Sequence, residues 1–521
     1  MSNNEARRHA LELRDAFALE PTGLVSYQSN GKVIALADDA TLQRCDELPA
    51  TVDINRVSSA GGQIRIEGHL GAYRVSVTDQ QGNSVTHRGD AVLDLNQNPL
   101  LTRELLPPGY FHAPPAEWQR LELERELENL VGEFDKPKYF DYDASICAHG
   151  VNGKVVCNQC IDACPAEAIF SLGERIEVDP NLCQGGGSCS TVCPSGAIRY
   201  RYPNLRDNGT RLRDMLQTYR RHGGADPIVL FHADSFAAQQ YLQAYDNLLP
   251  LAVEELASVG MDLCLSALAY GALQVVLVID AEVPSSAQDV LRRQLDWLHA
   301  LLAGLGLGSV YVTLCRADEA LPQVDRIDLA VPAIHDMPLQ KRNAIYQALD
   351  HLAVNLKPTA DRVTLPAGAP LGDVIVDAGK CTLCMACVGA CPGNALQDGS
   401  NREVPELFFV ESNCLQCGAC EQTCPEDAIT LQPRLLFDRE IRNRARALNR
   451  DKPFACIACG KPFAPTSVID KMQEKLKDHH MFGNQRALDR LKMCDDCRVA
   501  DIVQDPEAMG GQFDPLKGFR Q

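Results

Sequence analysis

The sequence has no feature that would carry it across a membrane, out of the cell or onto nucleic acid. None of its apolar runs approaches the ~20 residues that span a bilayer. Residues 1–20 form a charged amphipathic stretch without the apolar core and cleavage site of a secretory signal. The formal net charge of -19 argues against nucleic acid as the main partner, because phosphate binding needs a basic face. We therefore expect a cytoplasmic protein with no membrane span.

The sequence is also poor in catalytic motifs. It has no Walker loop, nucleophile elbow or HExxH pair, and no flavin, nicotinamide or pterin site is recognisable. Gly304-Leu-Gly-Leu-Gly308 has the spacing of a dinucleotide loop, but it follows a predicted helix and precedes a predicted strand. Because this order is the reverse of the required one, the glycines indicate the end of a helix. These absences favour a non-catalytic role or that of an enzyme subunit.

Cysteine, in contrast, is abundant. The chain contains 22 cysteines, and all but Cys45, Cys264 and Cys315 fall into tight groups. Reducing conditions make disulfides rare in a cytosolic chain, so the grouped thiols indicate metal ligands. We expect the three isolated cysteines to be buried structural thiols.

The chain is too long for one hydrophobic core, and its composition predicts a multidomain α+β protein. We expect a helix and a small β-rich domain over 1–135, a cysteine-rich module over 138–203, an α/β domain over 204–360, a second cysteine-rich module over 370–435, and a basic helix with a four-cysteine tail over 436–521. The predicted strands 228–231, 248–253, 274–279 and 310–314 alternate with helices, which favours a parallel sheet. The basic helix is predicted from Arg439, Arg442, Arg444 and Arg446, and we expect these arginines to form a solvated face; the alternative is a docking surface for an acidic partner.

The two cysteine-rich modules repeat each other, and each is internally duplicated. Four times a Cys-Pro pair opens a short segment that ends in Ala-Ile or Ala-Leu: CPAEAI, CPSGAI, CPGNAL and CPEDAI. A repeat of this kind indicates that both modules contain the same structural unit.

The second module has the standard spacing of two cubane clusters. Each cysteine run has two Cys-x2 steps and one Cys-x3 step before Cys-Pro. Three thiolates on one tight loop can hold three corners of a cluster, and the Cys-Pro of the other run supplies the fourth. One [4Fe–4S] cluster is thus predicted on Cys381, Cys384, Cys387 and Cys424, and another on Cys414, Cys417, Cys420 and Cys391.

The first run of the first module lacks its first ligand. Position 154, where that cysteine is due, is Lys154. An aspartate stands four residues before the first ligand in Asp179…Cys183 and Asp377…Cys381, and Asp143…Cys147 repeats this interval. We therefore expect Cys147 to be the first ligand, with 148–156 as an inserted loop; the alternative is a free Cys147 and a three-thiolate site. The third predicted [4Fe–4S] cluster uses Cys147, Cys157, Cys160 and Cys193.

The second run of the first module departs in another way. Its second ligand position is Gly186, which has no side chain that could coordinate a metal. The crossed pattern then leaves three ligands, Cys164, Cys183 and Cys189. Three thiolates suit a [3Fe–4S] cluster or a site-differentiated [4Fe–4S] cluster whose fourth iron binds water or an outside ligand; the other alternative is that no second cluster is bound. An open iron could bind a substrate.

The tail contains two further cysteine pairs, Cys456-x2-Cys459 and Cys494-x2-Cys497. Four thiolates on two loops form the ligand set of a structural zinc ribbon, so one Zn²⁺ is predicted here. A rubredoxin-like mononuclear iron uses a similar ligand set, although Arg498 stands where a second glycine is expected. His479 and His480, between the pairs, are spare ligands or solvated side chains.

These motifs carry three resemblances. The second module closely resembles the bacterial-type 2[4Fe–4S] ferredoxin family, and the first resembles a seven-iron or degenerate member, which implies duplicated βαβ ferredoxin-like folds. Residues 228–314 loosely resemble the hydrogenase or heterodisulfide reductase iron–sulfur subunit family. That family has Cys pairs where this chain has Phe231-His-Ala-Asp-Ser235, so we expect no [2Fe–2S] centre there. The layout also resembles 4Fe–4S proteins encoded near molybdenum formate dehydrogenases, which implies formate dehydrogenase as a redox partner.

The leading hypothesis is therefore a polyferredoxin-like protein that relays single electrons between a dehydrogenase, such as formate dehydrogenase, and an acceptor. One alternative is an oxidoreductase subunit that uses an open-coordination iron at the degenerate cluster. Another is an accessory or maturation protein for a metalloenzyme. The sequence does not separate this last alternative from the first hypothesis.

Overall fold

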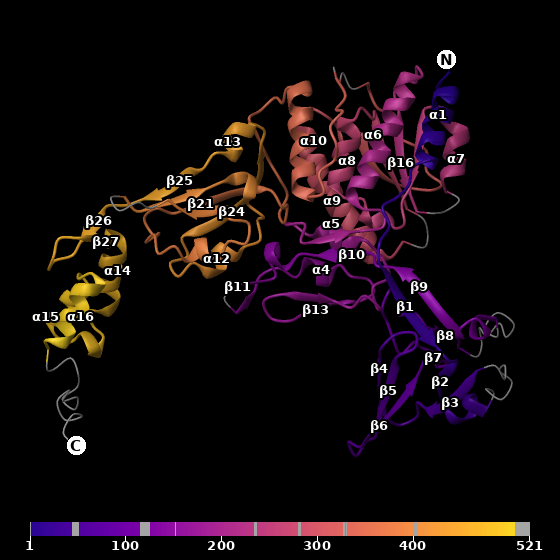
Figure 1. Cartoon of the computed structure of the whole chain (residues 1–521), viewed down its shortest axis with the longest axis horizontal. Helices are drawn as coiled ribbons and strands as arrows, with labels where there is room; N and C mark the ends of the chain where they lie inside the picture. The colour runs from indigo at the N-terminus through magenta and orange to yellow at the C-terminus, as the bar shows by residue number, and fades with distance from the viewer. Residues whose placement is uncertain are drawn as a thin grey trace. The chain divides into compact units, whose positions relative to one another are not determined.

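The structure is a computed structural model that describes residues 2–43, 52–114, 125–151, 153–233, 237–279, 283–326, 329, 331–399 and 404–505. It divides into two compact units, Met1–Ala360 and Asp361–Gln521 (Figure 1), and each is described by itself. Among the described residues, none of the helices combines the length and apolar character that crossing a bilayer requires. Cys45 lies outside the described residues.

The first unit begins with a helix, α1, followed by a β-rich region. Its core is a four-stranded parallel sheet in the order β3-β2-β7-β8, and the central strand β2 is buried at all but its first residue. A three-stranded antiparallel sheet, β4-β5-β6, and the pair β1-β9 complete it. The elements are α1 (Asn3–Asp15), β1 (Leu24–Ser29), β2 (Lys32–Ala37), α2 (Asp39–Leu42), β3 (Asp53–Ser58), β4 (Gln63–Glu67), β5 (Tyr73–Thr78), β6 (Ser84–Gly89), β7 (Ala91–Asp94), β8 (Tyr110–His112) and β9 (Gly132–Pro137).

The first cysteine-rich module follows directly. Two antiparallel pairs, β10-β15 and β13-β14, flank two short helices, and a small hairpin, β11-β12, occupies the predicted insertion. The elements are β10 (Phe140–Tyr142), η2 (Ala144–Ile146), β11 (Gly150–Val151), β12 (Lys154–Val155), α4 (Gln159–Asp162), β13 (Ile169–Ser171), β14 (Ile176–Val178), α5 (Ser188–Val192) and β15 (Ile198–Tyr200).

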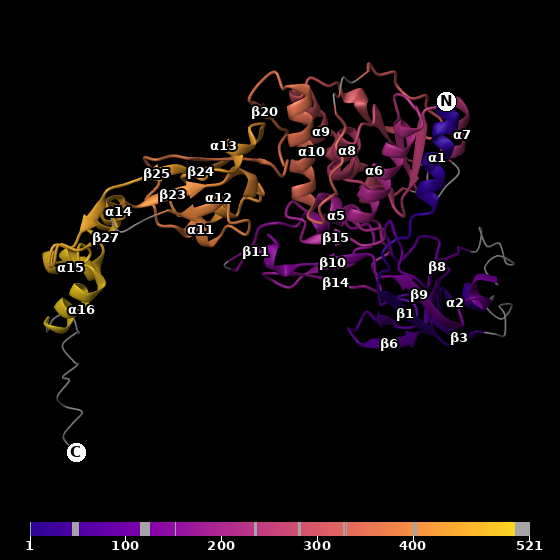
Figure 2. The ribbon, with the colours of Figure 1, turned by 45° about the horizontal axis from the view of Figure 1, so that its top comes forward.

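The α/β region contains the predicted parallel sheet, in the order β17-β16-β18-β19. The glycine-rich segment ends helix α9 at Gly304, as the order of its neighbours indicated. Helix α1, from the start of the chain, lies beside α6 and α7 of this region (Figures 1 and 2). The elements are α6 (Leu205–Arg221), β16 (Ile228–His232), α7 (Ala237–Ala244), β17 (Leu248–Ala252), η3 (Leu256–Ser258), α8 (Met261–Ala269), β18 (Gln274–Ile279), α9 (Ser285–Gly304), η4 (Ser309–Tyr311), β19 (Val312–Arg316) and α10 (Lys341–Leu356).

The second unit consists of the second module and the tail. Two antiparallel sheets, β20-β24-β21 and β22-β23-β25, enclose two short helices. The elements of the module are β20 (Arg362–Thr364), β21 (Gly372–Val376), α11 (Ala386–Gly389), β22 (Leu396–Asp398), β23 (Glu406–Phe409), η5 (Glu411–Asn413), α12 (Ala419–Thr423) and β24 (Ile429–Leu436). After α13 (Arg439–Asn443) and β25 (Arg446–Arg450), the tail has β26 (Pro453–Ala455), β27 (Pro462–Pro465), α14 (Thr466–Leu476), η6 (His480–Phe482), α15 (Gln485–Arg490) and α16 (Asp495–Val503).

The predicted basic helix is shorter than expected. Helix α13 ends at Asn443, and Arg446 begins strand β25, which pairs with β23. Arg442 is buried and donates to the Leu436 carbonyl at 2.7 Å, while Arg446 forms an ion pair with the buried Asp373. Arg442 therefore belongs to the interior of the module, and the half-buried Arg446 is tied to it by an ion pair, so the two do not form the solvated basic face that the spacing suggested.

Candidate iron–sulfur and metal sites

The cysteines of the second module lie near one another in two groups, each of which includes the Cys-Pro cysteine of the other run. Burial raises the pKa of the Cys387 thiol to about 12, and three neighbouring thiolates contribute to the rise, those of Cys381, Cys384 and Cys424. Burial likewise raises the pKa of the Cys420 thiol, with its largest charge contributions from Cys414, Cys417 and Cys391. Each run thus meets the Cys-Pro of the other. A site that crowds buried thiols suits a bound metal, because metal coordination stabilises thiolates.

The Cys-Pro repeat produces the same turn four times. The residue three positions after each of these cysteines has a positive φ: Glu167, Gly196, Asn394 and Asp427. In three repeats the turn aims the backbone N–H of the following alanine at the cysteine sulfur. The N···Sγ distances are 3.4 Å for Ala168 to Cys164, 3.2 Å for Ala395 to Cys391 and 3.4 Å for Ala428 to Cys424. Such N–H···S bonds tune an iron–sulfur centre, which explains why this short segment recurs.

The fourth repeat differs because a serine hydroxyl intervenes. Ser195 Oγ lies 3.6 Å from Cys193 Sγ and accepts the N–H of Ala197 at 3.2 Å. A left-handed residue also recurs before the short helices. Gly187, Met385 and Gly418 each have a positive φ and stand directly before a helix. These backbone features were not predicted from the sequence, although glycine, asparagine and aspartate at turn positions are a usable signal.

The structure brings Cys147 to the first run of the first module. Burial raises the pKa of the Cys160 thiol, and nearby thiolates raise it further, those of Cys193, Cys157 and Cys147. The inserted hairpin is held by His149, which is almost fully buried. Its Nδ1 lies 2.8 Å from the Cys157 carbonyl oxygen and its Nε2 lies 2.7 Å from Ser171 Oγ. The insertion therefore packs into the module and leaves Cys147 beside the other three cysteines.

Three cysteines, Cys164, Cys183 and Cys189, line one cavity of the first module. Burial raises the pKa of the Cys189 thiol, and among the charges that add to the rise those of Cys183 and Cys164 have the largest effect. Gly186 lines the same cavity, so the missing side chain faces the place where a fourth ligand would stand. The hydroxyls of Ser188 and Tyr200 are buried there without a hydrogen-bond partner among the described residues. Unpaired buried hydroxyls suit a bound group that accepts hydrogen bonds.

A buried cation lies at the C-terminal end of helix α5, between the two sites of the first module. Lys341 Nζ donates to the carbonyl oxygens of Ser190 at 3.0 Å and Cys193 at 3.4 Å, and also to that of Thr191. Burial lowers the pKa of Lys341, while the charge of the buried Asp262 raises it. A cation here complements the negative end of the helix.

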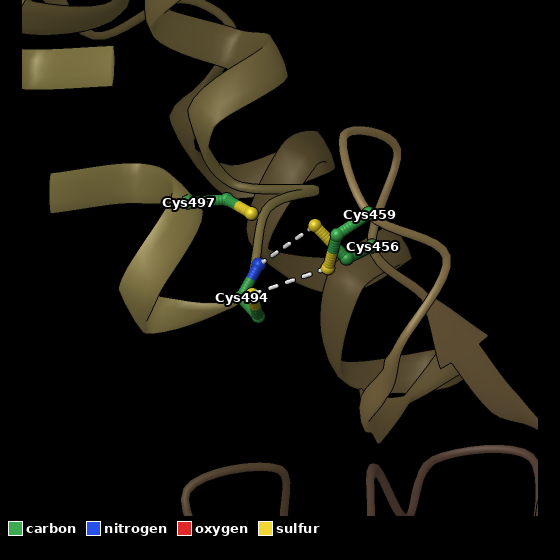
Figure 3. A group of neighbouring side chains, drawn as sticks. All are labelled: Cys456, Cys459, Cys494 and Cys497. Atoms are coloured by element: carbon green, nitrogen blue, oxygen red, sulfur yellow. Dashed lines mark hydrogen bonds between the residues drawn. The ribbon is translucent and has the colours of Figure 1, made fainter. Parts of the chain in front are cut away.

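The four cysteines of the tail lie much closer together than a cubane requires. Cys456 and Cys459 come from the loop between β26 and β27, and Cys494 and Cys497 from the start of α16; the two pairs face each other (Figure 3). All four sulfurs lie within 4.8 Å of one another. In the described part of the chain, no other group of three or more Cys, His, Asp or Glu ligands is this compact.

Backbone groups prepare this tail site for thiolates. Desolvation raises the pKa of the Cys456 thiol, but hydrogen bonds from backbone N–H groups to its sulfur lower the pKa by more. The largest of these effects comes from the N–H of Cys494, whose nitrogen lies 3.3 Å from the sulfur, and the pKa of Cys456 falls to about 6. His479 and His480 are not part of the compact group. Cys264 and Cys315 are buried in the α/β region away from the predicted ligand groups, as expected of structural thiols.

Comparisons with known proteins match both modules. The family model described as a 4Fe-4S dicluster domain matches residues 380–428, and the model described as a 4Fe-4S binding domain matches residues 176–199. The ferredoxin-type protein NapF of Escherichia coli K12 is 46% identical over 89 residues, which is 17% of this chain and 53% of NapF. The same values hold for NapF of Escherichia coli O157:H7. A ferredoxin of Saccharopolyspora erythraea is 37% identical over 46 residues, 9% of this chain and 43% of that protein.

The chain thus spans about half the length of the curated relatives it matches. The matched segment 176–199 includes Gly186, so the degenerate run is still similar to a 4Fe–4S domain. The chain carries ferredoxin-type 4Fe–4S domains, and together with the likeness to NapF these support an iron–sulfur protein of electron transfer.

Proposed function

We propose that the chain relays single electrons between a dehydrogenase, such as formate dehydrogenase, and an acceptor. The observation that supports this proposal is the proximity of cysteines from both runs in each module, because it would allow four separate ligand sets within one chain. Three of these sets would hold [4Fe–4S] clusters and the set of Cys164, Cys183 and Cys189 would hold a [3Fe–4S] cluster. The clusters supply one-electron redox chemistry.

The residues of the chain bury the clusters and set their surroundings. The N–H groups of Ala168, Ala395 and Ala428 donate to ligand sulfurs, and such bonds stabilise the more negative reduced state. Lys341 places a positive charge beside the first module. Cys384 is the exposed ligand of the second module, so its cluster is the one that a redox partner can approach from solvent.

The tail is proposed to hold one Zn²⁺ on Cys456, Cys459, Cys494 and Cys497. Zinc bound by four thiolates has no open coordination position and no redox chemistry. The ion would therefore stabilise the tail and take no part in electron transfer.

The test is anaerobic iron, sulfide and zinc analysis, with EPR of the oxidised and reduced protein. We expect about 15 irons and one zinc per chain. Cys420→Ala should remove about four irons, whereas Cys264→Ala, a buried cysteine outside the ligand sets, should remove none. A protein with two clusters only, or a Cys420→Ala variant with full iron content, would contradict the proposal. The partner is tested by mixing the oxidised protein with formate and formate dehydrogenase and following cluster reduction, because each formate oxidised to CO2 releases two electrons that two one-electron clusters can accept.

A further inference from the structure

The vacant ligand position of the first module is bordered by Pro165 and by a side chain from another domain. A Cβ atom added to Gly186 would lie 3.2 Å from Pro165 Cγ and 3.5 Å from Leu105 Cδ1. Leu105 belongs to the loop between β7 and β8 of the N-terminal domain. It lines the cavity of the three cysteines and packs, like Cys164 and Cys183, against a buried apolar cluster of the module, Ala166, Ala168 and Leu182. An apolar side chain thus occupies the space beside the missing ligand.

Residues 103–106, which we call the strap, are each fastened to the surrounding structure. Arg103 forms an ion pair with Glu167 at 2.9 Å and donates to the Ala166 carbonyl at 3.4 Å. The Leu105 N–H donates to the Pro165 carbonyl at 3.1 Å, and Gln184 donates to the carbonyl of Leu106.

The remaining residue of the strap, Glu104, is held by the first turn of helix α9. Its carboxylate accepts hydrogen bonds from the Ser286 N–H at 3.2 Å and from the hydroxyl groups of Ser285 and Ser286. These hydrogen bonds lower the pKa of Glu104, so its carboxylate is charged at neutral pH. The strap is therefore attached to the first module on one side and to the α/β region on the other.

We propose that Leu105 closes the vacant coordination position, so that the site keeps three irons even when ferrous iron and a reductant are present. This inference rests on the proposed function, because it requires a cluster on Cys164, Cys183 and Cys189. A fourth iron would need room beside Gly186 for itself and for a water or thiolate ligand. Leu105 borders that room with methyl groups, which cannot coordinate a metal. The site then acts as a closed three-iron relay and does not bind a substrate.

Iron uptake provides the test. Dithionite reduces an oxidised three-iron cluster by one electron, from [3Fe–4S]⁺ to [3Fe–4S]⁰; addition of Fe²⁺ then gives [4Fe–4S]²⁺ with no further electron. The full-length protein and two variants, Leu105→Ala and Leu182→Ala, are treated in this way. Leu182 belongs to the same apolar cluster but does not line the cavity, so it controls for the loss of an isobutyl group. Bound iron is counted after removal of excess metal, and the EPR signal of the oxidised three-iron cluster is recorded.

We expect the native protein and Leu182→Ala to keep their iron content and three-iron signal. Leu105→Ala should gain about one iron per chain and lose most of the signal. Uptake by the native protein equal to that of Leu105→Ala, or no uptake by Leu105→Ala, would overturn the inference. Native protein with full iron but no three-iron signal would overturn it as well, while the proposed electron relay would still stand on the second module.

A second pair of variants keeps the inference testable if Leu105→Ala weakens the fold. Gly186→Cys restores the standard cysteine spacing, but its sulfur must enter space held by Leu105 and Pro165. We expect Gly186→Cys to convert to four irons readily only when combined with Leu105→Ala. Equal conversion of the single and double variants would show that Leu105 does not close the position. Retention of the iron of the Cys147 cluster, which lies in the same module, reports whether each variant is folded.

Discussion

Replacing Cys494 with serine should empty the metal site of the tail and leave the iron–sulfur clusters in place. Cys494 is the N-cap of helix α16, with extended backbone dihedrals and no side-chain capping bond. Serine is among the preferred N-cap residues, so the substitution preserves the start of the helix. Any loss of tail structure in Cys494→Ser must then come from the loss of a metal ligand.

The distances in the site define the metal that it can hold. A tetrahedral ion with metal–sulfur bonds of about 2.3 Å has sulfur–sulfur edges of about 3.8 Å. The Cys459 and Cys494 sulfurs lie 3.8 Å apart, and all four lie within 4.8 Å of one another. This geometry suits one ion, whereas the thiolates of a cubane bind four different irons. The expected content is therefore about one zinc per native chain and none in Cys494→Ser.

The tail depends on this ion because its own core is small. Besides Cys456 and Cys494, the buried apolar residues of its described part are Ile469, Ala487 and Leu491. Large aliphatic side chains contribute about 1.5–3 kcal/mol each on full burial. A structural zinc ion contributes about 10–16 kcal/mol in zinc-finger peptides. Without the ion, residues 453–505 should unfold.

Limited proteolysis with metal analysis measures this outcome. We expect Cys494→Ser to be cut within 453–505 at protease concentrations that spare the native chain, with unchanged iron content. Cys315→Ser, which alters a buried cysteine outside the tail, is the matched control. A Cys494→Ser variant that keeps zinc and resists proteolysis would refute the reasoning. If the native chain instead contains one additional iron and no zinc, with the visible absorption of a mononuclear iron–thiolate site, the tail binds rubredoxin-like iron.

Three further predictions concern the first module. Lys341→Met should lower the potential of its clusters by roughly 40 mV, the one-electron equivalent of about 1 kcal/mol; redox titration with no shift would contradict this. His149→Ala removes both hydrogen bonds by which His149 holds the inserted hairpin. The variant should therefore lose the Cys147 cluster, about four irons, before it loses any other cluster; equal iron loss from all clusters would count against this role of His149. Ser188→Ala should lower the potential of the three-iron cluster by removing a hydroxyl donor, which EPR-monitored titration would detect; an unchanged value would show that the hydroxyl does not bond the cluster.

The sequence predicted the parts of the structure that depend on local spacing. The parallel sheet followed from alternating strands and helices, and Cys147, proposed as a ligand from the interval after Asp143, lies near Cys160. Cysteine ligands must lie on short loops to reach one cluster, so their spacing is visible in the chain. The ligand sets, the zinc ion and the cytoplasmic location stay predictions.

Features that depend on distant partners were not visible in the sequence. Arg442 and Arg446 have the spacing of a solvated helix face, yet their partners are the Leu436 carbonyl and Asp373 of another strand. Leu105 stands in a loop without any motif, and its role arises only because the strap packs against Pro165 and Gln184, about 60 and 80 residues away. Tertiary contacts of this kind override local propensity.

The same ligand turn has different surroundings in the two modules, and this difference can be measured. Gly187 and Gly418 precede equivalent short helices with φ of +74° and +83°, so alanine suffers similar backbone strain at both positions, of about 1 kcal/mol. A Cβ at Gly187, however, would lie 2.5 Å from the backbone nitrogen of Ser258, whereas one at Gly418 would meet only Gln422 Nε2 at 3.9 Å.

Gly187→Ala should therefore lower the stability of its module by about 1–3 kcal/mol more than Gly418→Ala lowers that of the second module, because this is the usual range for overpacking. The measurement is the rate of iron release from each module in urea, followed by the separate EPR signals of the three-iron and four-iron clusters. Equal destabilisation would show that the loop around Ser258 does not press on helix α5. A larger effect at Gly187 would show that the ligand loop of the first module is also an interface with the α/β region. The sequence of this loop is then constrained by both the cluster and the interface, unlike that of a separate ferredoxin domain.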